Sequence, residues 1–160
     1  MRVRDDPDLN LARSELEKDE LGFVIVKAQR VVVSSRDHGI GDLITAAEEL
    51  RRDRVSAAAL ADRIAGQAAL MVGCWAAIRA LHAGLISEAA LEEARRRGLP
   101  VTFRRRVPRI MNRQRSGPCP FELATSQAIE QGLTLDEIVV RLREGLGAMS
   151  WAPASDRPLP

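Results

Sequence analysis

Residues 116–124, SGPCPFELA, place a cysteine and an acid where a helix is expected to begin. Pro120 suits the first helical position because it has no N–H to satisfy there. Cys119 is then the N-cap, and Glu122 falls at the third helical position. One interpretation is a capping box in which sulfur replaces the usual hydroxyl. The other is a reactive thiol for thiol or sulfur transfer, because helix N–H groups and the nearby Arg113 lower a thiol pKa, although Glu122 opposes this.

A second group of polar residues precedes the apolar stretch AALMVGCWAA. In one interpretation Asp62 caps the helix that this stretch forms and Arg63 pairs with a neighbouring acid. In the other, these groups line a pocket for a ligand, because burying them unpaired is costly. An anion could equally bind the free N–H groups behind Cys119, with arginine side chains closing on it. The candidate ligand-binding residues are Asp62, Arg63, Gly66, Gln67, Asn112, Arg113 and Glu122.

Arginines are concentrated between residues 104 and 115 and could bind phosphates or nucleic acid. The chain has no Tyr, 3 Phe and 2 Trp, so it lacks the aromatic platforms on which single strands stack. Strand alternation also places Arg104 and Arg106 on the face opposite to Arg105. Nucleic-acid binding is therefore not expected.

The composition is that of one soluble domain. The 160 residues are 46% hydrophobic and 29% charged, and the net charge of +2 shows that acids nearly balance the arginines. Two cysteines and a charged N-terminus indicate neither a disulfide scaffold nor a signal peptide. The longest apolar run, 64–78, is shorter than the ~20 residues of a membrane span. We expect a cytoplasmic protein without a membrane segment.

The periodicity predicts an α/β protein. Strands are expected at 23–27, 30–35, 57–61, 78–86 and 101–105, and helices at 9–19, 42–52, from 62 to 77, 87–98, 120–131 and from 134 onward. A hairpin followed by alternating strands and helices favours a three-layer α/β/α sandwich with a mixed sheet. The expected domain spans residues 9–147, between a flexible N-terminus (1–8) and a disordered tail (148–160).

Four stretches in this order, SSRDHGI, ALADRIAGQAA, HAGLISEAALE and NRQRSGPCPFE, carry a family resemblance. They resemble a prokaryotic family of domains of unknown function with a cytidine-deaminase-like fold. The resemblance covers roughly residues 9–145. It implies a fold and no settled activity.

Zinc-dependent deaminases hold their metal with a His or Cys followed by a Glu two residues later at the start of the central helix, and with P-C-x-x-C on the next helix. The corresponding segments here, DRIAGQ and SEAA, contain no such set. His82 is interpreted as a buried strand residue with one ring nitrogen satisfied. Cys119-Pro-Phe-Glu122 has Glu in place of the second Cys. The chain is therefore not expected to be a zinc-dependent deaminase, and no metal or cofactor is predicted.

The leading hypothesis is a metal-free domain that binds a small anionic or nucleotide-like ligand. A cysteine-dependent enzyme using Cys119 is the first alternative. A non-catalytic assembly module is the second, because the apolar strands at the sheet edge are consistent with a homodimer.

Overall fold

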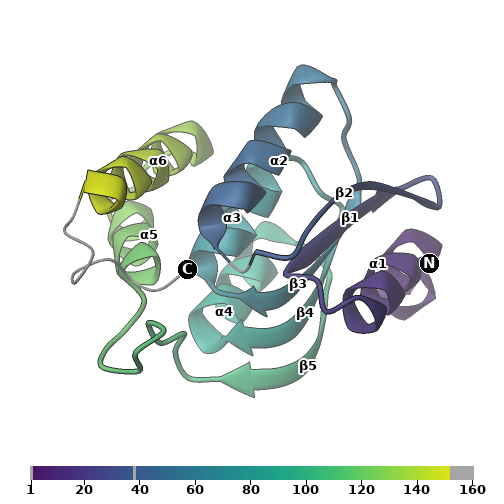
Figure 1. Ribbon diagram of the computed structural model, residues 1–160, viewed down its shortest axis with the longest axis horizontal. Coiled ribbons are helices and arrows are strands. Elements are labelled where there is room, and N and C mark those ends of the chain that lie inside the picture. Colours follow the sequence, from purple (N-terminus) through teal and green to yellow (C-terminus); the bar gives the residue numbers. More distant parts are fainter. Residues whose placement is uncertain (1, 38, 152–160) are drawn as a thin grey trace.

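A computed structural model describes residues 2–37 and 39–151 of the chain (Figure 1). His38 and residues 152–160 of the expected tail lie outside the described residues. The elements, in chain order, are η1 (Val3–Asp5), α1 (Pro7–Lys18), β1 (Phe23–Lys27), β2 (Arg30–Ser35), α2 (Ile40–Arg52), β3 (Ala59–Ala65), α3 (Gln67–Trp75), β4 (Ala80–Ser87), α4 (Glu88–Arg97), β5 (Val101–Val107), α5 (Pro120–Glu130) and α6 (Leu135–Trp151).

The five strands form one mixed sheet in the order β2-β1-β3-β4-β5. β1 is antiparallel to both β2 and β3, whereas β3, β4 and β5 are parallel to one another. The predicted α/β class and the mixed sheet are therefore confirmed. Because β1 runs antiparallel to β3, the first residues of β1 lie beside the carboxyl end of β3, where Phe23 pairs with Asp62.

Helices cover both faces of the sheet (Figure 1). α1 packs on β1, β3 and β4 from one side, and α3 and α4 pack on the strands from the other. α2 lies beside α3, and the pair α5–α6 packs over α3. α3 is thus enclosed by the sheet and by other helices, which explains why its sequence is apolar nearly all round. In the described part of the chain, no helix combines the length and hydropathy that a membrane crossing requires.

The start of the central helix differs from the prediction. β3 continues to Ala65, so Asp62 and Arg63 lie on a strand, and the helix α3 begins only at Gln67. The sequence pattern was ambiguous because β3 pairs with a strand on each side, and a strand buried on both faces has no polar alternation. The extended conformation of Gly66, with φ −95° and ψ −171°, ends the strand and starts the helix.

The helix α4 follows its local signals. Ser87 accepts a hydrogen bond from the Ala90 N–H, and Gly98 adopts the left-handed conformation that terminates the helix. Both caps depend on contacts within one turn of the chain, and the observed helix lies within the range of 87–98 predicted from the sequence.

The β1–β2 hairpin turns without glycine. Ala28 and Gln29 both have positive φ, which L-residues rarely adopt. The Asp8 carboxylate on α1 accepts hydrogen bonds from both backbone N–H groups, at 3.0 and 2.7 Å. Burial tends to raise the pKa of Asp8, but hydrogen bonds from Gln29 and Arg79 hold it at about 2. A contact from a neighbouring helix therefore stabilises a turn that the local sequence disfavours. Helices and strands are found from Val3 to Trp151, and the domain limits of 9 and 147 expected from the sequence stay a prediction.

Candidate functional site

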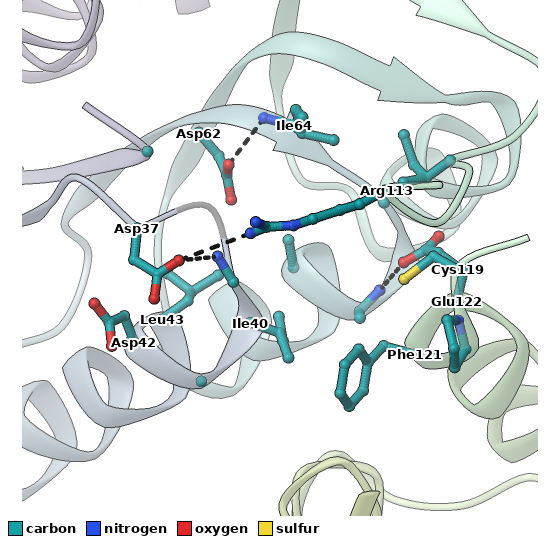
Figure 2. Close-up of a pocket in the computed structure, with 18 of the residues that line it drawn as sticks. Asp37, Ile40, Asp42, Leu43, Asp62, Ile64, Arg113, Cys119, Phe121 and Glu122 are labelled. Atoms are coloured by element: carbon teal, nitrogen blue, oxygen red, sulfur yellow. Dashed lines mark hydrogen bonds and ion pairs between the residues drawn. The ribbon is translucent and has the colours of Figure 1, made fainter. Parts of the chain in front are cut away.

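A cavity of about 410 Å³ lies at the carboxyl end of β3 (Figure 2). Its walls come from the start of β1, the β2–α2 loop, the first turns of α2, α3 and α5, and the 108–119 segment. In sheets with parallel strands, ligands commonly bind in the crevice outside the carboxyl ends of the strands. Its lining is mainly apolar and includes Phe23, Ile64 and Phe121.

Asp62 is the buried polar group of this cavity. Strand alternation directs Asp62 and Ile64 to the face covered by α3, and only 9% of the Asp62 surface is exposed. The carboxylate accepts a hydrogen bond from the Ile64 N–H at 3.0 Å and forms no ion pair within the described residues. Burial raises the pKa of Asp62 to about 7, although the Ile64 N–H acts in the opposite direction. At neutral pH this carboxyl group is therefore divided between its acid and ionised forms.

Glu122 binds the N-terminus of another helix. Its two carboxylate oxygens accept hydrogen bonds from the backbone N–H groups of Gln67, at 2.7 Å, and Ala68, at 2.9 Å. Glu122 therefore caps α3, whereas the sequence predicted a capping box within α5. Gly66 makes room for this contact, because an added Cβ would lie 2.2 Å from the carboxyl carbon. Burial raises the pKa of Glu122 against the effect of the two N–H groups.

Cys119 is the N-cap residue of α5, as predicted, but its side chain makes no capping hydrogen bond. Burial raises the pKa of its thiol, while the N–H groups of Glu122 and Phe121 lower it by a smaller amount. This direction is opposite to the lowered pKa expected from the sequence. A thiol that stays protonated at neutral pH is a poor nucleophile.

The 108–119 segment forms a tight loop beside the cavity. Met111 pairs with Pro118 in an isolated bridge, and the Asn112 side chain exchanges two hydrogen bonds with Ser116, each 3.0 Å long. Asn112 lines the cavity, but its amide group holds the loop together. Arg113 extends from this loop across the cavity toward Asp37, with an N–O distance of 4.0 Å (Figure 2).

Two candidate residues contribute no side chain to the cavity. Arg63 points to the opposite face of the sheet, where its guanidinium donates to the carbonyl oxygens of Leu21, at 2.8 Å, and Leu16, at 2.9 Å. Gln67 is buried and supplies its backbone N–H to Glu122. The candidates that line the cavity are Asp62, Gly66, Asn112, Arg113, Cys119 and Glu122. The structure thus brings Cys119 and Asp62, which the sequence analysis treated as two separate groups, to one cavity.

Sequence reasoning missed the β2–α2 loop as part of the site. Asp37 accepts a hydrogen bond from the Gly39 N–H, and Asp42 accepts one from the Ser35 hydroxyl. Both acids line the cavity. The available signal was the polar, glycine-bearing stretch SSRDHGIGD, but its position next to Asp62 depends on the pairing of β1 with β3.

Carboxyl groups dominate the charge of the cavity. Asp37, Asp42, Asp62 and Glu122 line it, and Arg113 is the single cationic side chain among the described residues that do so. Among those residues, no group of three His, Cys, Asp or Glu side chains is arranged to hold a metal ion.

His82 lies away from this site, on β4. Its Nδ1 is 2.8 Å from the Thr102 hydroxyl, and its Nε2 has no hydrogen-bond partner within the described residues. Burial lowers the pKa of His82 to about 4, so the ring is neutral at pH 7. Its interpretation as a buried strand residue with one satisfied nitrogen is confirmed.

Comparisons with known proteins give a family and a fold. Residues 11–139 match the family described as Domain of unknown function (DUF1893). The solved structure of a DUF1893 family protein from Thermotoga maritima is similar, with a TM-score of 0.73 and 22% sequence identity over 88% of this chain and 91% of that one. No curated protein matches the chain.

Proposed function

The chain belongs to the DUF1893 family, and we propose that it is a ligand-binding domain for a small, planar, mostly apolar molecule that presents N–H donors along one edge, as a nucleobase does. The observation that carries this proposal is the buried Asp62 carboxyl group, which faces a cavity and has no cationic partner among the described residues.

A ligand with N–H donors would offset the cost of burying Asp62. The carboxyl group has acceptor capacity beyond its hydrogen bond from Ile64. A hydrogen bond to an ionised carboxylate contributes about 1.5–3 kcal/mol. The cavity, at about 410 Å³, is near the lower end of the roughly 300–1,000 Å³ typical of small-molecule sites. It suits a single heterocycle better than a dinucleotide.

The charges that line the cavity disfavour one of the two ligand classes expected from the sequence, the anionic one. Four carboxyl groups and a single guanidinium are found among the described residues that line the cavity, which disfavours an anionic ligand. The positive end of α3, where an anion would otherwise bind, is already neutralised by Glu122. We therefore retain the nucleobase-like part of the hypothesis and not the anionic part.

Neither alternative is favoured by a specific observation. The raised pKa of Cys119 weakens the hypothesis of a thiol enzyme. No described contact identifies an assembly interface.

The finer fold assignment, a cytidine-deaminase-like arrangement without zinc ligands, also stays a proposal. It is supported by the mixed sheet and by the enclosed helix α3, whose first residues Gln67, Ala68 and Ala69 include no His, Cys or Glu.

Calorimetric titration with cytosine and guanosine tests the proposal. We expect binding to the wild-type protein and at least about tenfold weaker binding to Asp62→Asn, a difference of roughly 1.4 kcal/mol. Asp53→Asn is the matched control, because it makes the same change at an exposed site at the end of α2. Absence of binding by both probes, or equal affinities for wild type and Asp62→Asn, would contradict the proposal.

A further inference from the structure

We infer that the cavity binds an amidinium or guanidinium cation. Without a ligand, the guanidinium of Arg113 occupies the position of this group beside Asp37, and the ligand displaces it. This inference rests on the proposed function, and it adds the charge and shape of the group that the ligand presents.

The geometry of Arg113 is that of a side chain closing the cavity from outside. It starts on the loop that Asn112 holds together and extends across the cavity toward Asp37 (Figure 2). Arg113 and Asp37 come from segments more than seventy residues apart, on opposite sides of the cavity. The Arg113 side chain has 35% of its surface exposed, and the Asp37 side chain has 48%. Arg113 therefore places its positive charge at the cavity without being packed into the core.

The contact between Arg113 and Asp37 is readily exchanged. Its N–O distance of 4.0 Å is at the outer limit of an ion pair, and both partners are in contact with solvent. Exposed pairs of this kind contribute little to stability. A ligand cation that contacts Asp62 would make an ion pair that Arg113 does not make in this structure. Asp62 makes the difference, because it is nine-tenths buried and no cation pairs with it in the described residues.

The displaced group indicates what replaces it. A guanidinium or amidinium is planar, carries its positive charge permanently at neutral pH, and presents N–H donors in a fork that matches a carboxylate. An aromatic or aliphatic body attached to that fork would contact the apolar wall formed by Phe23, Ile64 and Phe121. A neutral compound of the same shape can still donate a hydrogen bond to Asp62, but it does not replace the charge that Arg113 supplies at Asp37, and it therefore binds without displacing Arg113.

Titration with benzamidine tests the inference, with benzamide as the neutral probe of nearly the same shape and benzoate as the anionic one. Arg113→Gln removes the competing guanidinium, so we expect it to bind benzamidine about two- to fivefold more tightly than the wild-type protein. Arg115→Gln is the matched control, because it removes the same charge from the same loop at a residue that does not line the cavity. We expect this variant to change the affinity less than about twofold.

A second readout follows Arg113 directly. In ¹H–¹⁵N spectra of the wild-type protein, the Nε resonance of Arg113 is expected to shift as benzamidine binds and not with benzamide. Weaker or unchanged benzamidine binding by Arg113→Gln, or equal gains from both arginine variants, would overturn the inference. If cytosine or guanosine still bound in an Asp62-dependent way, the proposed function would stand and this inference alone would fail. Failure of every probe would reject both.

Discussion

Replacing Asp62 by Asn is expected to stabilise the protein, and to do so only above about pH 4, where the carboxyl group of the unfolded chain ionises. Asn keeps the shape of the side chain and can still accept the hydrogen bond from the Ile64 N–H. It cannot ionise, so it removes the cost of placing a negative charge in a buried site. The expected gain therefore follows the titration of Asp62 itself.

The sign and size of the effect follow from proton linkage. The pKa of Asp62 is about 7 in the folded protein against an ordinary value of 3.8, because burial disfavours the carboxylate. Between these values the folded state holds more protons than the unfolded state, so wild-type stability falls as pH rises. The decrease is about 1.4 kcal/mol per pH unit, and roughly 4 kcal/mol is lost by about pH 8. Below pH 3.8 both states are protonated and nothing is lost.

Urea denaturation of both proteins at several pH values between 4 and 9 measures this effect. Subtracting the two unfolding free energies at each pH removes the contributions of all other titrating groups. The difference should be near zero at pH 4, should increase through pH 5 and 6, and should level off above pH 7. Equal m-values would show that both proteins expose the same surface on unfolding. A difference that does not vary with pH would refute the reasoning, since it would mean that Asp62 ionises as freely in the folded state as in the unfolded one.

Three further predictions follow from individual contacts. Gly66→Ala is expected to cost about 3 kcal/mol of stability in urea denaturation, because its Cβ displaces the Glu122 carboxylate from two N–H groups; a neutral result would contradict the assigned role of this glycine. Arg63→Ala is expected to lower stability by about 1–3 kcal/mol and to leave cytosine binding unchanged, since its guanidinium binds carbonyls on the other face of the sheet. If calorimetry showed weaker cytosine binding by Arg63→Ala at unchanged stability, Arg63 would have to be counted among the ligand-binding residues. The alkylation of Cys119 by iodoacetamide is expected to have its midpoint at a higher pH than that of glutathione, because burial raises the pKa of the thiol. A midpoint at a lower pH than that of glutathione would support the hypothesis of a cysteine-dependent enzyme.

Local signals predicted much of the fold. The caps of α4, at Ser87 and Gly98, and the start of α5 at Pro120 follow from side-chain and backbone preferences that act within one helical turn. The strand-and-helix order also indicated a mixed sheet. The start of α3 was predicted wrongly because Asp62 and Arg63 follow the apolar residues 59–61 without a clear alternation, and only the pairing of residues 59–65 with two neighbouring strands makes them a strand.

The candidate site was predicted in its residue types more than in its arrangement. Six of the eight candidate residues line one cavity, yet the acids of the β2–α2 loop were missed because they adjoin Asp62 only through the pairing of β1 with β3. The sequence also could not distinguish Asp62 from Arg63. Once these neighbours lie on a strand, alternation sends one to the cavity and the other to α1.

The sequence by itself therefore determined where most helices and strands form and which polar residues lack an obvious local partner. The tertiary structure alone decided which of those residues meet. Glu122 shows why: its sequence position predicts a cap for its own helix, but its carboxylate binds the N-terminus of α3, 54 and 55 residues earlier in the chain. Its pKa is raised and that of Asp62 reaches about 7 because of burial, which no short stretch of sequence specifies. Capping and periodicity act over a few residues, whereas burial and charge pairing depend on how distant segments pack.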